Sequence, residues 1–263
     1  MQLFEKLGFR WDRSVIPAGV PASVDRSLFR YKQMLAQFVF DASSLEGNPF
    51  TFPQVQTLMD GVTVGGHKIS DEQQVLNLAS AARELLSLVK SESFELDKQT
   101  FDRLHNLVAK EEAWEWGHFR GEGAETSATW PVKLGDDEYW PELTEAGATN
   151  LNRIFSEGVE ALESEVSDLR ERGMAFFLFG ALQQFYFDGN KRTSRFMMNG
   201  VLMSHGFDAI SVPAKRAQEF NENMVRFYLG KDATEMMRFL IDCQPKNAPT
   251  PKPTSSPSSG PSM

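Results

Sequence analysis

The chain contains very little cysteine. Cys243 is the only one among 263 residues, so an intramolecular disulfide is excluded and a reducing compartment is expected. The first residues, 1–6, lack the apolar run of a secretory signal peptide. The apolar run at 174–182 is too short to cross a membrane and predicts a buried helix. We therefore expect a cytoplasmic protein with no membrane partner.

Basic residues are also in short supply. The chain has 27 Lys and Arg against 36 Asp and Glu, a formal net charge of -9. A surface that binds nucleic acid needs a basic face to neutralise phosphates, so this balance argues against a nucleic-acid partner. The length suits one sizeable domain. The oligomeric state is left open, with a homodimer among the candidates.

Clear periodicity is missing at both ends of the chain. Residues 1–26 carry Pro17 and Pro21 and predict an extended lead-in. Residues 243–263 are rich in Pro, Ser and Thr with almost nothing apolar, which predicts a disordered tail. Residues 27–242 are expected to form one mainly α-helical domain. The expected helices are 27–40, 70–89 (capped by Ser70), 97–112, 143–172, 199–205, 215–229 and 233–242.

The most informative stretch of the sequence is 188–195. Gly189 and Asn190 tolerate left-handed backbone angles, so they can end one helix and aim N–H groups at an anion where the next helix starts. Arg192 and Arg195 are three apart and offer forked donors that match phosphate. Asp188 supplies a hard oxygen ligand suited to magnesium. Together these residues predict a polyphosphate site.

The segment 184–195, which reads Gln-Phe-Tyr-Phe-Asp-Gly-Asn-Lys-Arg-Thr-Ser-Arg, resembles the signature of the Fic (Fido) family. That signature is His-x-Phe-x-Asp/Glu-Gly-Asn-Gly/Lys-Arg-x-x-Arg. The resemblance implies a Fic-type helical bundle with a small β-hairpin flap, and ATP bound with Mg. It places ATP on Gly189, Asn190, Lys191, Arg192 and Arg195, and the metal on Asp188. The catalytic position, where the family has a general-base histidine, is occupied by Gln184.

Two further stretches resemble parts of the same family. Residues 42–48 are similar to its inhibitory motif, which implies that Glu46 pairs with Arg195 in a member with an N-terminal inhibitory helix. The alternative is an exposed glutamate at a helix end. Residues 117–140 resemble the flap that holds a target protein's main chain by strand addition. Two histidines near these stretches are interpreted as a packed or capping residue, His105, and a surface residue, His118.

The resemblance implies transfer of AMP to a hydroxyl of a target protein (AMPylation). A carboxamide such as Gln184 can accept a hydrogen bond but cannot take a proton at neutral pH, so weakened activity is expected. The same substitution motivates a second hypothesis, a catalytically inactive nucleotide-binding pseudoenzyme. Phosphotransfer, suggested by Lys191, and AMP removal with Glu46 as the base are further alternatives.

Overall fold

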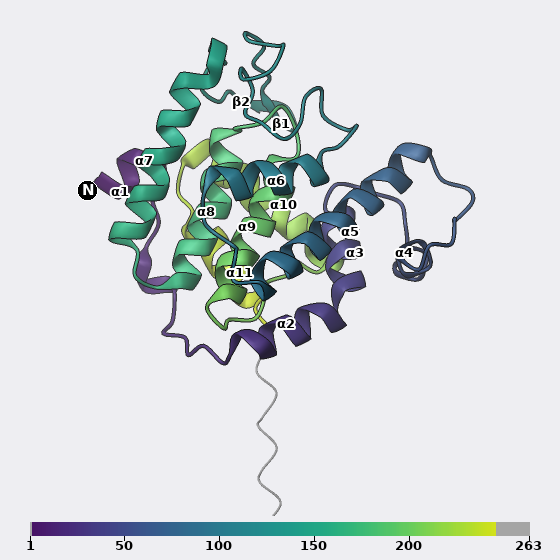
Figure 1. Cartoon of the computed structure of the whole chain (residues 1–263). Helices are drawn as coiled ribbons and strands as arrows, with labels where there is room; N and C mark the ends of the chain where they lie inside the picture. The colour runs from purple at the N-terminus through teal and green to yellow at the C-terminus, as the bar shows by residue number, and fades with distance from the viewer. Residues whose placement is uncertain (1, 246–263) are drawn as a thin grey trace, which may run out of the picture.

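The computed structural model describes residues 2–245. It is mainly α-helical with one small antiparallel hairpin, which confirms the fold class expected from the sequence. The helices and strands (Figure 1) are α1 Gln2–Leu7, η1 Arg13–Val15, α2 Val24–Gln33, α3 Leu35–Ser44, α4 Phe52–Met59, α5 Ile69–Lys90, α6 Lys98–Val108, β1 Val132–Leu134, β2 Asp137–Tyr139, η2 Ala146–Ala148, α7 Thr149–Glu165, α8 Leu169–Gln183, α9 Asn190–Ser204, η3 Ala214–Arg216, α10 Ala217–Gly230 and α11 Thr234–Asp242.

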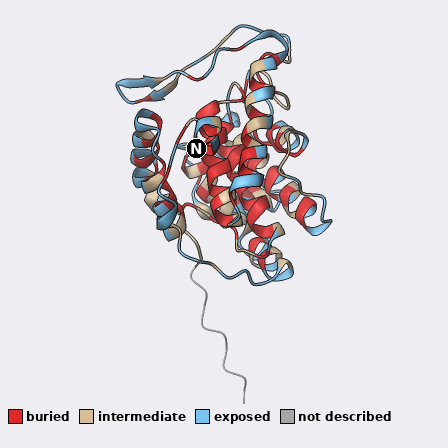
Figure 2. Cartoon of the chain, turned by 90° about the vertical axis from the view of Figure 1, so that its left-hand side faces the viewer, coloured by how far each residue is buried: buried red, intermediate tan, exposed pale blue. Residues whose placement is uncertain are grey.

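Helices α8 and α9 form the centre of the bundle. Nearly every residue of both is buried, and the other helices surround them (Figures 1 and 2). The apolar run 174–182 lies within α8 and is fully buried, as predicted. A helix that is apolar on all sides is stable only inside such a core. The two helices approach closely at Gly180, where an added Cβ would lie 2.1 Å from the hydroxyl of Ser194.

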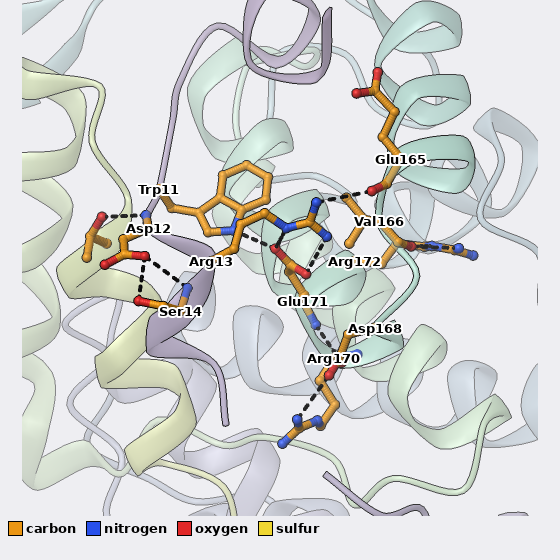
Figure 3. A network of polar contacts seen from close by, with 11 residues as sticks. Trp11, Asp12, Arg13, Ser14, Glu165, Val166, Asp168, Arg170, Glu171 and Arg172 are labelled. Atoms are coloured by element: carbon orange, nitrogen blue, oxygen red, sulfur yellow. Dashed lines mark hydrogen bonds and ion pairs between the residues drawn. The ribbon is translucent and has the colours of Figure 1, made fainter. Parts of the chain in front are cut away.

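The N-terminal segment does not form the predicted extended lead-in. Residues 2–7 are helical, and Leu7 and Trp11 are buried in the core. Glu171, in the first turn of α8, accepts hydrogen bonds from Trp11 Nε1 at 2.8 Å and Arg13 Nε at 2.7 Å (Figure 3). These long-range partners, invisible to local periodicity, order the segment and fix the start of α8.

Several helix boundaries also differ from expectation. The helix predicted over 27–40 is interrupted at Met34, which separates α2 from α3. Ser70 is not a cap, because α5 starts one residue earlier with Lys68 at the N-cap position. The predicted helix 143–172 is two helices. The second starts afresh because the Asp168 side chain accepts hydrogen bonds from two amides of the first turn of α8.

The predicted flap region contains the hairpin of β1 and β2, in which Val132 pairs with Tyr139. The ring of Tyr139 lies 5.2 Å from that of Tyr228 in α10, which places the hairpin beside that helix. At the other end, α11 stops at Asp242, and most of the predicted tail lies outside the described residues. The division of the chain at 27 and 242 stays a prediction. Among the described helices, none is both long and apolar enough to cross a membrane.

Candidate functional site

The turn between α8 and α9 is held in shape by its own side chains. Gly189 adopts a left-handed conformation with φ of 74°, which favours glycine. The Asn190 side chain accepts a hydrogen bond from Tyr186 N at 2.9 Å and donates one to Tyr186 O at 2.7 Å. Helix α9 starts at Asn190, so the amides of its first turn have no acceptor within the helix. This arrangement can receive an anion.

His105 ties the turn to the beginning of the flap. Its Nδ1 accepts a hydrogen bond from Gly117 N at 3.0 Å, so its Nε2 carries the proton and donates to Asp188 O at 2.9 Å. The ring stacks on Tyr186 with centroids 3.6 Å apart. Burial lowers the pKa of His105 to about 3, so the imidazole is neutral. It is a packed histidine, as interpreted from the sequence.

An open cleft lies in front of this turn, with about 630 Å³ of empty space when the solvent at its mouth is counted. The signature, the inhibitory motif and the approach to the hairpin all contribute to its walls. The lining residues are Glu46, Trp130, Pro131, Val132, Gln184, Phe187, Asp188, Gly189, Asn190, Lys191 and Arg192. The structure thus brings together every predicted site residue except Arg195, which lies directly behind Glu46 through the contact described below.

Arg192 is buried and held by two carboxylates. Its Nη1 lies 2.5 Å from Glu112 Oε2, and its Nη2 lies 3.5 Å from Asp188 Oδ1. Glu112 is fixed in turn by hydrogen bonds from the side chains of Gln74 and Asn77, both at 3.1 Å. Burial alone would lower the pKa of Arg192, but Glu46, Asp188 and Glu112 raise it above its ordinary value. Glu112 was missed in the sequence, where no local signal marks it.

The Glu46 carboxylate faces Arg195, with 3.4 Å between Oε1 and Nη2. The Glu46 side chain is 18% exposed, so it is not a solvated glutamate at a helix end. Burial alone would raise its pKa, but Lys191, Arg195 and Arg192 together lower it below its ordinary value. Glu46 is therefore ionised at neutral pH. Glu46 lines the cleft and Arg195 does not, so the carboxylate lies between the cleft and this arginine.

Both the nitrogen and the oxygen of the Gln184 carboxamide form hydrogen bonds within the protein. Its Nε2 donates to Ala181 O at 2.6 Å and lies 3.5 Å from the Tyr228 hydroxyl, and its Oε1 accepts from Asn190 Nδ2 at 3.1 Å. The backbone carbonyl accepts from buried Arg120 Nε at 2.6 Å. The residue is left-handed, with φ of 51°. Gln184 is thus a fixed structural member of the turn that cannot take a proton.

The predicted magnesium ligand has the exposure that such a role needs. The Asp188 side chain is 62% exposed at the edge of the cleft. Within residues 2–245 no cluster of three or more His, Cys, Asp or Glu could hold a metal by itself. Mg²⁺ typically takes one or two carboxylates together with substrate phosphates and water. An accessible carboxylate beside a turn that can receive an anion fits this pattern.

An exposed aromatic cluster, formed by Trp114, Trp130 and Phe187, lies at the mouth of the cleft. The two indole rings stack 5.3 Å apart, and Phe187 lies 5.1 Å from Trp130. Both tryptophans are exposed. The cluster was missed in the sequence because its members come from three separate segments. His118, by contrast, is partly exposed, lies 3.4 Å from Glu115 and does not line the cleft.

The fold is that of Fic-domain structures. The chain superposes on Fic-1 of C. elegans with a TM-score of 0.67 and 20% identity, over 92% of this chain and 66% of that one. It superposes on a Fic-domain-containing signaling protein from Bacteroides thetaiotaomicron with a TM-score of 0.64 and 16% identity, over 92% and 91%. Each likeness establishes the fold of the chain.

The sequence is distantly similar to proteins named protein adenylyltransferase Fic. Identity is 23% over 246 residues with the Culex quinquefasciatus protein and 24% over 218 residues with that of Drosophila willistoni. These matches cover 91% and 82% of this chain, but it spans less than half the length of either relative, 45% and 41%. No family model matches the chain. The chain has the Fic fold and is a distant relative of Fic adenylyltransferases.

Proposed function

We propose that this chain is a Fic-type protein that binds ATP with Mg and transfers AMP slowly to a hydroxyl of a target protein. The observation that carries the proposal is the start of α9. There, the first residues of α9, including Lys191 and Arg192, line an open cleft, while Glu46 lies 3.4 Å from Arg195. Helix N-termini and arginines are the groups that bind polyphosphates.

In this proposal the residues of the turn have different roles. The α9 amides, Lys191 and Arg192 would bind the phosphates, and Asp188 would hold a magnesium ion, which would neutralise part of their charge. The target hydroxyl oxygen bonds to the α-phosphorus, the bond to the β-phosphate oxygen breaks, and pyrophosphate leaves. The hydroxyl proton passes to solvent, because Gln184 cannot accept it. Loss of a general base costs about 10²- to 10⁴-fold in rate, so slow transfer remains.

The target protein is proposed to dock beside the flap. A hairpin of two strands leaves an unpaired edge, and extended peptides bind such edges by strand addition. The aromatic cluster Trp114, Trp130 and Phe187 lies next to Asp188 at the same mouth. Exposed aromatic groups of this kind are typical of protein contact surfaces. Glu46 acts as a brake in this scheme, because it occupies the arginine that a phosphate would use.

A second candidate function is favoured by the hydrogen bonds of Gln184. Because its amide nitrogen donates to Ala181 O and its oxygen accepts from Asn190, the side chain already has a structural role in the turn. A pseudoenzyme that binds ATP without transferring it would use Gln184 in this way. The phosphate site would be the same, so binding alone does not separate the two functions.

One experiment separates them. The protein is incubated with cell extract and ATP labelled on either the α- or the γ-phosphate, and ATP binding is measured in parallel by calorimetry. Protein labelled only by α-labelled ATP supports AMP transfer, label from the γ-phosphate indicates phosphotransfer, and binding without label supports the pseudoenzyme. Arg192→Ala should weaken binding at least tenfold, whereas Arg153→Ala, at an exposed position of α7, serves as the control. Undetectable binding at millimolar ATP would refute the nucleotide site.

A further inference from the structure

A groove runs along α7, and residues 95–98, which lead into α6, form its opposite wall. Helix α7 lies at the outside of the bundle, beside α1 (Figure 1). The groove has about 1140 Å³ of empty space when the solvent at its mouth is counted. It shares no lining residue with the cleft in front of α9, so it is a separate surface of the molecule.

The α7 wall of the groove is a single stripe of the helix. Its residues recur with the spacing of one helix face along about three turns, a length of about 16 Å. Other sides of α7 pack against α1 and α8. The stripe consists of Asn152, Phe155, Ser156, Val159, Glu160 and Glu163. Such a stripe is long enough for a short helix to lie along it.

The middle of the groove is apolar. Phe155 and Val159 contribute to it from α7, and Leu96 contributes from the opposite wall. Phe155 is buried, whereas Leu96 and Val159 are only partly buried against the core. A partner that covered Leu96 and Val159 would remove apolar surface from water, which favours association.

Acidic side chains line both walls of the groove. They are Glu95 and Asp97 on one wall and Glu160 and Glu163 on the other. Glu95 and Glu163 are exposed, and no cation within residues 2–245 forms a salt bridge with either. The Glu160 carboxylate is 76% exposed and lies 3.9 Å from the Lys6 ammonium group, a weak contact in water. The described residues therefore leave most of this negative charge unpaired.

The one cation that lines the groove in the described part of the chain, Lys98, does not offset these acids. Its ammonium group lies 2.6 Å from Asp102 and 2.9 Å from Glu122. Neither of these two carboxylates lines the groove, so the charge of Lys98 is balanced within the protein. The groove thus presents a negative potential to a partner.

We propose that this groove binds a short basic amphipathic helix of another protein. The apolar side of that helix would cover Leu96 and Val159, and lysines or arginines at its edges would pair with Glu95 and Glu163. Amphipathic helices bind apolar grooves in this way. Opposite charges at the rim of such an interface speed association and exclude wrong partners.

The charge of the groove selects among classes of partner. Nucleic acids and anionic membrane surfaces are negative, so the groove would repel them. A second copy of this chain has a formal net charge of -9 and is also repelled. A basic segment of a different protein is therefore the occupant that the groove fits best.

The probe for this proposal is a synthetic helical peptide of about three turns, with leucines on one face and lysines at its edges. A scrambled peptide of the same composition is its match. Calorimetry with the full chain and no nucleotide should give micromolar binding of the probe and several-fold weaker binding of the scrambled peptide. Binding of the probe should also weaken several-fold in about 1 M salt, where charges are screened within about 3 Å.

Variants locate the binding. Glu95→Lys with Glu163→Lys should weaken binding of the probe roughly tenfold, because two exposed ion pairs are lost and two repulsions appear. Glu157→Lys with Glu235→Lys, at solvent-accessible positions outside the groove, changes the net charge equally and should have little effect. Val159→Asn makes the middle of the groove polar and should weaken binding several-fold. Thermal unfolding checks that each variant is folded, and the charge reversals decide the matter if Val159→Asn is not.

Absence of probe binding, or equal binding of the scrambled peptide, would overturn the proposal. An equal loss of affinity in the variant at Glu157 and Glu235 would also overturn it, because the attraction would then come from the net charge of the whole chain. A dimer in sedimentation that the reversals at Glu95 and Glu163 disperse would show instead that a second copy covers the groove. None of these measurements involves ATP, so this proposal and the proposed function can fail independently.

Discussion

Replacement of Glu46 by Gln should tighten ATP binding and destabilise the ATP-free protein. In the wild type, a phosphate that takes Arg195 must first displace a carboxylate 3.4 Å away, in a pair whose side chains are 10% and 18% exposed. Such a charge-assisted hydrogen bond contributes about 1.5–3 kcal/mol. The carboxamide of Gln would still bond to the charged guanidinium but would lose the opposite charge, so we expect about half of this value, about 1–1.5 kcal/mol, or roughly a tenfold gain in affinity.

Glu46→Gly removes the competitor entirely and should give the larger gain, up to roughly 100-fold for the full 1.5–3 kcal/mol. Without nucleotide, both variants lack one of the anions that lower the mutual repulsion of Lys191, Arg192 and Arg195. The melting temperature should therefore fall, and ATP with Mg should restore it because it binds only the folded state.

The assays are calorimetry with ATP and Mg, and thermal unfolding with and without ATP. Glu222→Gln, which changes a largely exposed carboxylate on α10, is the control and should alter neither quantity. Equal ATP affinity in the wild type, Glu46→Gln and Glu46→Gly, with an unchanged melting temperature, would refute the brake. A loss of ATP affinity would show instead that Glu46 supports the nucleotide site.

Three further predictions concern the same region. Gln184→His in the Glu46→Gly background should raise self-AMPylation by up to about 10²- to 10⁴-fold; a silent double variant that still binds ATP would favour the pseudoenzyme. Arg192→Ala should weaken ATP at least tenfold in calorimetry, since a charged donor contributes about 1.5–3 kcal/mol, and should also leave Glu112 unpaired and lower the melting temperature; retention of full affinity would contradict the assignment. His105, with its pKa lowered to about 3, stays neutral in the folded state, whereas the same residue in the unfolded state is protonated below about pH 6.5. The free energy of unfolding should therefore fall by up to about 1.4 kcal/mol per pH unit as the pH drops from 6.5 toward 3. Denaturant titrations of His105→Asn should show a flatter dependence of this free energy on pH between about 6.5 and 5.

The sequence by itself predicted the elements whose signals are local. Residues 174–182 are apolar on all sides, and a helix of that kind must be buried. The turn at 188–190 needed only adjacent residues, because Gly189 supplies the left-handed angle and Asn190 bonds to Tyr186 four residues away. The resemblance to the Fic signature extended these local signals to the fold class, including the hairpin.

Only the tertiary structure showed which residues far apart along the chain form contacts with each other. Arg192 meets Glu112 across 80 positions of the chain, and Trp11 meets Glu171 across 160, yet neither acid lies in a motif. The pairing of Glu46 with Arg195, implied by resemblance, acquires its distance and burial only in the folded structure, where the residues after α3 meet α9. Periodicity specifies which face of a helix is buried, but which side chains meet there depends on how helices from separate parts of the chain pack around α8 and α9.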